Sequence, residues 1–448
     1  MRLWGFFGAL CAVALCALMA VVLWPAPAPL IAWGPLPLTL DEAAIERGRY
    51  MAIAGDCVAC HTAPAGRPFA GGLAIASPFG PIYSSNITPD RQTGIGSYTL
   101  DEFERALRRG IARDGSSLYP AMPYPSFARL SIADVKDLYG YLMHGVEPVA
   151  QQNQAVGIPW PLSMRWPLAL WRKAFAPADL DKNSEQGRYA SAQIARGAYL
   201  VEGAGHCGAC HTPRAVTLQE RALDDSSALF LAGGSLIDGW VAVNLRGNTA
   251  EGLGNWTAAD IVSALRGART VSNAVVGRPM SDVVVHSTQY LAIEDLRAIA
   301  AYLKTLPPTK NEASSFVADP ATAHDLATGR DAGRGAELYV DNCAACHRTD
   351  GRGSRNAIPT IAGNSSVLAD NPSSIIRLIL AGGALPSTTT APSPLGMPGF
   401  AWRLSNAELA ALATFVRSSW GNHAPAVDST QVELVRSAIA RENQPAGR

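Results

Sequence analysis

The sequence lacks an excess of charge of either sign. Lysine plus arginine and aspartate plus glutamate number 37 each, only 17% of the 448 residues are charged, and no long basic run occurs. A protein that binds nucleic acid through its phosphates normally presents a basic surface. The composition therefore gives no support for nucleic-acid binding, whereas the 48% hydrophobic content can bury the cores of about three ordinary domains.

Cysteines available for disulfide bonds and alternating strand patterns are also missing. Of the eight cysteines, six lie in three short motifs, and the other two, Cys11 and Cys16, lie in an apolar stretch near the N-terminus. No cysteine is left for a disulfide framework. No period of two persists anywhere along the chain, so the sequence predicts mainly helical domains.

The first 24 residues carry almost no charge. Arg2 is followed by an uncharged run over 3–24. A secretory signal has an apolar core of about 7–15 residues and a spanning helix needs about 20, so the length favours a retained N-terminal membrane helix with Arg2 in the cytoplasm. A cleaved signal is the alternative, because small residues around Ala26 and Ala28 resemble a processing site. Both interpretations export the rest of the chain.

One sequence unit occurs three times. Each copy begins with an Arg-Gly pair in a short helix that leads into a cysteine motif. Two further helices follow each motif, with apolar residues three and four apart, and Ser131 and Ser405 are expected to cap two of them. The pairs are Arg47-Gly48, Arg196-Gly197 and Arg334-Gly335, and the later helices are expected over 100–110, 131–143, 258–268, 292–306, 373–383 and 405–420.

Changes in composition separate the three copies. A proline-rich linker precedes the first copy, a linker rich in tryptophan and proline follows it, and a polar linker separates the last two. Trp160, Trp166 and Trp171 of the second linker either face a membrane or partner or, as we favour, pack between domains. The predicted division is membrane or signal segment 1–24, linker 25–40, domain 41–146, linker 147–185, domain 186–308, linker 309–327, domain 328–421 and tail 422–448.

The repeated motif is Cys-x-x-Cys-His, the attachment sequence for c-type haem. Two thiols add across the two vinyl groups of one porphyrin, and the adjacent histidine lies under the ring, where its imidazole binds iron. A zinc site would use paired Cys-x-x-Cys motifs or distant histidines, and a thioredoxin-like motif needs no histidine after the second cysteine. The sequence therefore predicts three haem c groups, attached through Cys57, Cys60, Cys207, Cys210, Cys343 and Cys346, with His61, His211 and His347 as iron ligands.

A second axial ligand is expected downstream of each motif. Methionine is the usual partner in electron transfer and raises the reduction potential. Met122, Met280 and Met397 each adjoin a proline and precede the last helix of their copy. A lone methionine more often fills a core, but the same placement in each copy predicts iron ligands. Met143 is the rival in the first copy and is expected to pack within a helix.

One match to a nucleotide-binding fingerprint has another explanation. The stretch 203–208 fits G-x-G-x-x-G, but that fingerprint requires a strand before it and a helix after it. Here it overlaps the second cysteine motif and no strand precedes it. The sequence therefore predicts no nucleotide site.

Taken in order, these motifs resemble the tri-haem cytochrome c subunits of membrane-bound bacterial dehydrogenases. The resemblance covers about residues 41–422 and is carried by stretches such as GDCVACHTAPAG, SNITPDRQTGIGSYTLDEFERALRRG, LYPAMPYPSFARLS, HCGACHTPR and MPGFAWRLSNAEL. Such subunits serve alcohol, gluconate or sorbitol dehydrogenases, and similar chains accompany molybdenum hydroxylases for aldehydes or N-heterocycles. The resemblance implies a mainly α chain of three tandem class I cytochrome c domains preceded by an N-terminal membrane helix, with the ligand pairs His61–Met122, His211–Met280 and His347–Met397.

The resemblance also implies an electron-transfer subunit without catalytic residues, which is not an enzyme as an isolated chain. A separate dehydrogenase subunit of the PQQ, flavin or molybdenum type would oxidise the substrate. This chain would pass the electrons to ubiquinone or another acceptor of the respiratory chain, at the bacterial inner membrane with its haem domains on the periplasmic side. The alternative is a haem enzyme, such as a peroxidase or thiol-oxidising cytochrome. That activity requires an open or cysteine-bound sixth position, whereas every copy has its methionine.

Overall fold

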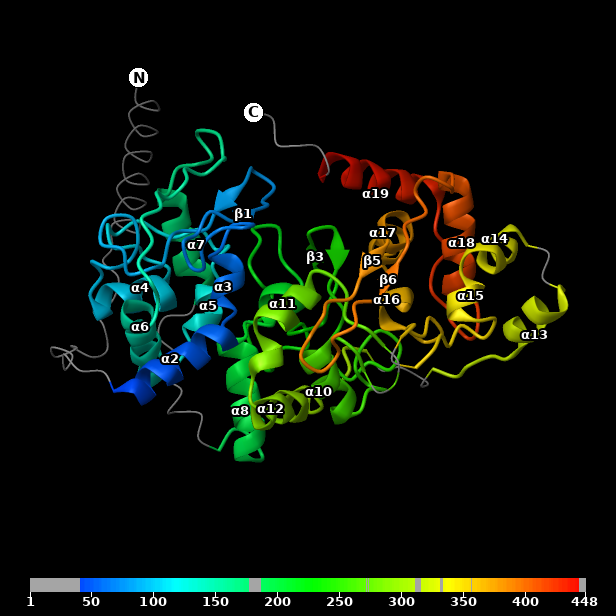
Figure 1. Ribbon diagram of the computed structural model, residues 1–448, viewed down its shortest axis with the longest axis horizontal. Helices are drawn as coiled ribbons and strands as arrows, with labels where there is room; N and C mark the ends of the chain where they lie inside the picture. Colours follow the sequence, from blue (N-terminus) through cyan, green and yellow to red (C-terminus); the bar gives the residue numbers. More distant parts are fainter. Residues whose placement is uncertain are drawn as a thin grey trace, which may run out of the picture. The chain divides into compact units, whose positions relative to one another are not determined.

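A computed structural model describes residues 41–176, 187–270, 272, 274–310, 316–330, 333–355 and 357–442. In these ranges most of the regular secondary structure is helical, and three short antiparallel strand pairs are present (Figure 1). The chain divides into two compact units, Met1–Ala52 with Cys60–Ser184, and Ile53–Ala59 with Glu185–Arg448.

The elements follow the order of the sequence copies. From residue 41 to 176 they are α2 (Glu42–Ala54), α3 (Cys57–Cys60), β1 (Ala74–Ile75), β2 (Ile82–Tyr83), α4 (Leu100–Arg109), α5 (Tyr124–Phe127), α6 (Ile132–His144) and α7 (Trp166–Phe175). From residue 187 to 310 they are α8 (Ala192–Ala198), the π-helix η2 (Tyr199–Ala204), α9 (Gly208–His211), β3 (Leu236–Ile237), β4 (Trp240–Val241), α10 (Ala258–Gly267), α11 (Met280–His286), η3 (Thr288–Tyr290) and α12 (Ile293–Leu303). From residue 316 to 442 they are α13 (Ala321–Thr328), α14 (Arg334–Asn342), α15 (Ala344–His347), α16 (Ser365–Leu368), α17 (Ser373–Ala381), β5 (Gly383–Ala384), β6 (Gly396–Met397), α18 (Asn406–Ser418) and α19 (Ser429–Glu442).

The predicted helices and caps are confirmed. Ser131 Oγ accepts the N–H of Asp134 at 3.1 Å at the start of α6, and Ser405 Oγ accepts that of Glu408 at 3.3 Å at the start of α18. These bonds satisfy backbone donors that the first turn of a helix leaves without a partner. The Glu408 side chain also accepts the N–H of Ser405, which completes a capping box.

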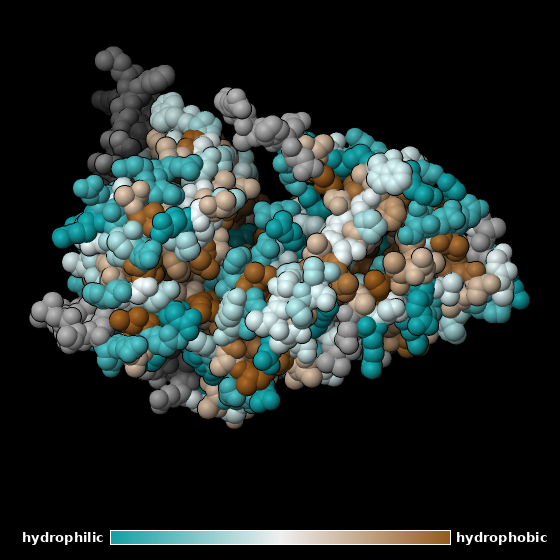
Figure 2. Space-filling view, viewed as in Figure 1, coloured by the Kyte–Doolittle hydropathy of each residue, from teal (hydrophilic) through white to brown (hydrophobic). Residues whose placement is uncertain are grey.

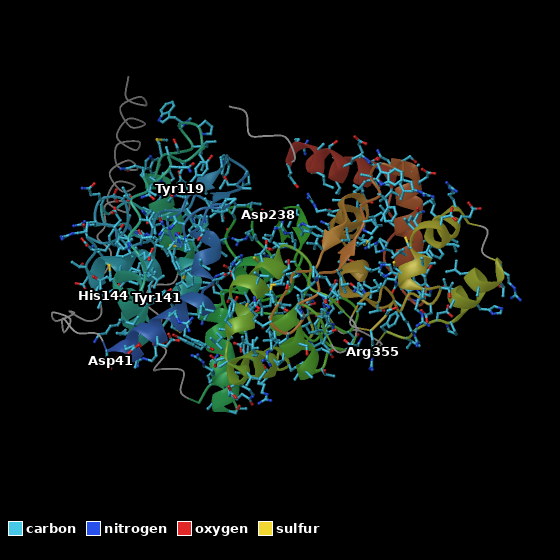
Figure 3. All side chains as sticks on the ribbon, in the orientation of Figure 1. Asp41, Tyr119, Tyr141, His144, Asp238 and Arg355 are labelled. Carbon is cyan, nitrogen blue, oxygen red and sulfur yellow. The ribbon has the colours of Figure 1, made fainter. Side chains whose placement is uncertain are left out.

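The first and last long helices of each copy cross at the glycine of the Arg-Gly pair. A Cβ atom at Gly48, Gly197 and Gly335 would lie 2.0, 2.0 and 2.6 Å from a carbonyl oxygen of the facing helix. Only a residue without a side chain allows such an approach. The facing helix also contributes an aromatic residue. In the first copy this is Tyr141 of α6, which is labelled in Figure 3. Its Cβ would lie 2.8 Å from a Cβ at Gly48.

The arginine of each pair joins the same two helices. Each guanidinium binds a carboxylate in the first half of the last helix. The pairs are Arg47–Asp137 at 2.6 Å, Arg196–Asp295 at 2.7 Å and Arg334–Glu408 at 2.6 Å. Because the arginines are substantially exposed, each pair adds little to stability. Arg-Gly therefore recurs at the same point of each copy, where the glycine allows the close crossing and the arginine binds the facing helix.

The expectation of three tandem class I cytochrome c domains is wrong, because the chain divides into two compact units. The second and third copies pack into one of them. At the hairpin β3–β4, whose turn carries Asp238 (Figure 3), Val241 N–H donates to Ser374 Oγ of α17 at 2.8 Å. Arg377 Nε of the same helix donates to Gly239 O at 3.1 Å. Helical periodicity identifies the elements but carries no signal for these contacts between copies.

The expected N-terminal membrane helix, 1–24, lies outside the described residues. Within the ranges that the structure describes, no helix is long and apolar enough to span a bilayer.

Two segments expected to be linkers contain helices. Helix α7 lies within 147–185, and most of α13 lies within 309–327. Trp171 of α7 packs edge to face on Tyr124, with ring centroids 6.2 Å apart. Trp160 and Trp166 are 78% and 44% exposed, so the expected packing does not hold for them.

The tail forms a surface helix, α19. It buries Val432, and its Glu442 binds Arg377 of α17 through two bonds of 2.6 and 2.7 Å. The C-terminal helix is therefore fastened to the unit formed by the second and third copies.

Candidate haem-attachment sites

Each cysteine motif forms about one turn of helix. The short helices α3, α9 and α15 contain most of the three motifs. Residues three apart on a helix lie on one face, so the two sulfurs of each motif point to the same side. None of these six cysteines is in a disulfide bond. This arrangement suits two thioether bonds to a single porphyrin.

The histidine that ends each motif is held by a backbone carbonyl. In each case Nδ1 of the imidazole contacts the carbonyl oxygen of a residue downstream. The contacts are His61–Ser85 at 2.7 Å, His211–Val243 at 2.7 Å and His347–Pro359 at 3.1 Å. A neutral imidazole that donates from Nδ1 has its lone pair on Nε2, the arrangement found in metal-ligating histidines. All three histidines therefore fit an iron ligand.

Burial sets the protonation of these groups. It lowers the pKa of His61, His211 and His347, which favours the neutral imidazole that a metal requires. Burial also raises the pKa of Cys207 and Cys343 to about 12, so both thiols are protonated at neutral pH. Structural zinc binds thiolates instead. In the part of the chain that the structure describes, no group of three or more His, Cys, Asp or Glu side chains could hold a metal ion.

The carbonyl acceptors are functional positions that sequence reasoning missed. Ser85 and Val243 each directly precede an asparagine, and these asparagines begin the stretches NITPD and NLRGN that recur in the first two copies. The side-chain oxygen of Asn86 accepts the N–H of Thr88, and that of Asn244 accepts the N–H of Arg246, at 2.9 and 2.8 Å. These local turns fix the backbone next to the acceptor. The asparagine that recurs in the first two copies is the sequence feature from which these carbonyl acceptors could have been found.

The expected methionine ligands lie between the second and third long helices of their copies. Met122 lies in a turn before α5, Met280 begins α11, and Met397 forms β6; all three are half-buried. Met397 and Cys343 both pack against the hydrophobic cluster of the third copy. Met143 lies on α6, as expected for a packing residue.

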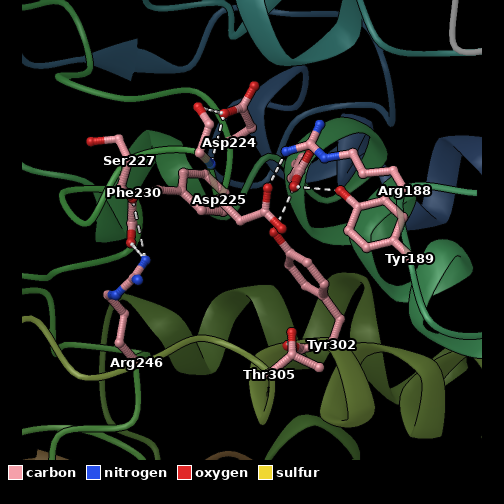
Figure 4. Close-up of polar contacts among 11 residues, drawn as sticks. Arg188, Tyr189, Asp224, Asp225, Ser227, Phe230, Arg246, Tyr302 and Thr305 are labelled. Carbon is pink, nitrogen blue, oxygen red and sulfur yellow. Dashed lines mark hydrogen bonds and ion pairs between the residues drawn. The ribbon is translucent and has the colours of Figure 1, made fainter. Parts of the chain in front are cut away.

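A buried carboxylate links the second motif to the last helix of its copy. Glu202, on the π-helix η2, accepts hydrogen bonds from the hydroxyls of Tyr302 at 2.5 Å and Tyr189 at 3.2 Å. Both tyrosines are labelled in Figure 4. Burial and the neighbouring Glu202 raise the pKa of Tyr302, so its phenol remains a donor. Because Tyr302 lies on α12 and Glu202 lies five residues before Cys207, this contact ties the last helix of the copy to the attachment motif.

Comparisons with known proteins agree with this site. A family model described as cytochrome c matches residues 332–420, which lie in the third copy alone. This single match is a second finding against three tandem class I cytochrome c domains.

The chain is also similar to curated proteins over most of its length. It is 51% identical to the alcohol dehydrogenase (quinone) cytochrome c subunit of Gluconacetobacter polyoxogenes, over 86% of this chain and 82% of that protein. It is 50% identical to the gluconate 2-dehydrogenase cytochrome c subunit of Pantoea cypripedii, over 86% and 88%, and 36% identical to the fructose dehydrogenase cytochrome subunit of Gluconobacter japonicus, over 90% and 85%. The chain therefore belongs to the cytochrome c subunits of bacterial dehydrogenases, which are electron-transfer subunits rather than enzymes on their own.

Proposed function

We propose that this chain carries three covalent haem c groups and relays electrons from a catalytic dehydrogenase subunit to membrane quinone or another respiratory acceptor. The observation that carries the proposal is the bond from Nδ1 of His61, His211 and His347 to a backbone carbonyl. It leaves Nε2 available for iron at each of the three attachment motifs.

Three kinds of side chain have separate roles at each proposed haem site. Haem c, when bound, gains and loses one electron. The six motif cysteines would hold the porphyrins, and the three histidines together with Met122, Met280 and Met397 would bind the irons. With both axial positions filled, a site has no place for a substrate or peroxide. The proposed ligands therefore favour electron transfer over catalysis by the chain itself.

The donor is a separate dehydrogenase subunit of the PQQ, flavin or molybdenum type. The names of the relatives support a donor that oxidises an alcohol, a sugar acid or a sugar. The name of the alcohol dehydrogenase subunit includes quinone, which supports a quinone as the acceptor.

We place the complex at the periplasmic side of the bacterial inner membrane. Covalent haem attachment to an exported chain agrees with that location. On the face drawn in Figure 2, hydrophobic residues form small separate patches among hydrophilic ones. Trp160, Leu162 and Trp166, which are 78%, 58% and 44% exposed, give the first unit an apolar surface of the kind that inserts into a membrane interface.

Purification from host membranes without harsh detergent tests the proposal. The expected complex contains the chain and a dehydrogenase subunit, and addition of that subunit's substrate reduces all three haems. A soluble quinone analogue then reoxidises them. A chain that purifies without a dehydrogenase, and that no dehydrogenase substrate reduces in the membrane, would contradict the proposal.

A further inference from the structure

The strand that contains Met397 closes a loop that reaches beyond its own copy. Strand β6 pairs antiparallel with β5, so that Met397 lies opposite Gly383, two residues after the end of α17. The loop between the strands covers 385–395 and is closed at its base by the bond from Leu385 N–H to Leu395 O at 2.7 Å. At its tip, Thr388 is only 5% exposed and accepts the N–H of Ala391 through its hydroxyl. Hydrogen bonds therefore hold the loop at its base and at its tip.

The tip of this loop lies against the second copy. The N–H of Thr389 donates to Gln289 Oε1 at 3.2 Å, and a guanidinium N–H of Arg269 donates to Ser393 O. The close packing continues at the end of α10, where a Cβ at Gly267 would lie 2.8 Å from Thr390 Oγ1. Two polar contacts and a close approach thus fix the loop to the second copy.

One of these contacts also involves α11, the helix of the expected ligand Met280. Gln289 Nε2 donates to Val285 O at 2.7 Å, and Val285 lies on α11, the helix that begins at Met280. A single amide side chain therefore connects the helix of one expected iron ligand to the loop of the next.

We propose that Gln289 and Arg269 are positioning residues for the third haem. They hold loop 385–395 from the second copy and thereby keep Met397 in place as an axial ligand. This inference rests on the proposed ligand role of Met397. A methionine on a loop binds iron only as long as the loop keeps its sulfur in reach, and loss of that bond lowers the reduction potential. The ligation of one haem then depends on packing against the neighbouring copy.

The double variant Gln289→Ala/Arg269→Ala of the full holo-chain tests this. Ferric haem with a methionine ligand has a weak absorption band at the red end of the visible spectrum. We expect the variant to lose up to about a third of that band and to show a lower potential for one haem. Intact mass should show all haems still attached, which establishes that the variant folds and matures.

Two further variants exclude a general effect of charge or stability. Arg297→Ala removes a charge from the exposed face of α12 in the same copy and should leave the band and the potentials unchanged. Arg269→Lys retains a cationic donor for Ser393 O, so combining it with the native Gln289 should restore most of the band.

The outcomes separate this inference from the proposed function. If Met397→Ala removes part of the band but the double variant leaves both band and potentials as in the unmodified chain, the inference is overturned and the proposed function stands. If Met397→Ala leaves the band intact, the proposed ligand itself is wrong.

Discussion

A histidine binds a metal through one ring nitrogen only when the other nitrogen carries the proton. The sequence identifies His61, His211 and His347 from the Cys-x-x-Cys-His motif, but the motif does not say which nitrogen faces the iron. The carbonyl contacts to Nδ1 supply that information. At this scale, the attachment residues could be read from spacing alone, whereas the acceptors could not, because a backbone carbonyl leaves no residue type to recognise.

The methionine ligands lead to a prediction for single residues. Met122→Ala, Met280→Ala and Met397→Ala should each remove one ligation and leave all haems attached, because the thioether bonds and the histidine are untouched. The red absorption band should fall by about a third in each variant, and the potential of one haem should fall with it. Met143→Ala is the matched control on α6 and should leave the band unchanged. A methionine whose replacement leaves the spectrum as it was is not a ligand.

At the scale of elements, the repeated helix crossing explains the Arg-Gly pairs. Periodicity predicted the helices of each copy to within a few residues, and the caps at Ser131 and Ser405 followed from the same reasoning. The crossings themselves could not be predicted, since a glycine inside a helix indicates a close contact without naming the partner. The two-residue strands were missed because they are too short to show a period of two.

Replacement of Gly197 by alanine should destabilise the second unit. The added Cβ would lie 2.0 Å from Ala298 O of α12, so the helices must separate. We expect a loss of about 1–3 kcal/mol in the free energy of unfolding, which exceeds the gain of about 1 kcal/mol from better helix propensity. Gly277→Ala is the control, because an added Cβ there meets nothing within 4 Å. Equal melting curves for the two variants would contradict the crossing.

The cap of α18 predicts a dependence on acid. Hydrogen bonds from Arg334 and from the N–H of Ser405 lower the pKa of Glu408 to about 2 from its ordinary value of 4.5. A carboxylate with a lowered folded pKa stabilises the protein fully above its unfolded pKa and loses that contribution as the pH falls through the folded one. The melting temperature of Glu408→Gln should therefore lie below that of the unmodified chain at pH 6, and the difference should shrink as the pH falls from about 4.5 to 2.

A second glutamate provides the comparison for this effect. Glu433 lies on α19, and its described partners, Asn406 and Ser437, are uncharged. Glu433→Gln is the matched control, because it makes the same change at a glutamate whose described partners carry no charge. The melting-temperature difference between Glu408→Gln and the unmodified chain could instead stay constant between pH 6 and pH 2. The ionised Glu408 side chain and its ion pair with Arg334 would then not stabilise the cap of α18.

At the scale of the whole molecule, the three sequence copies do not form three independent structural units. Three copies predict three bodies, yet the second and third form one unit through the hairpin β3–β4 and loop 385–395. These contacts join side chains to backbone atoms of another copy. Neither composition nor periodicity records such pairs, which is why the number of units could not be obtained from the sequence.

Intact mass of the mature chain tests the central claim most directly. The account predicts a mass above that of the polypeptide by three haem groups, each of which survives denaturation because its thioether bonds are covalent. Replacement of both cysteines of one motif by alanine should lower the excess by one group. A mature chain whose mass equals that of the bare polypeptide, or exceeds it by fewer than three haems, would contradict the account.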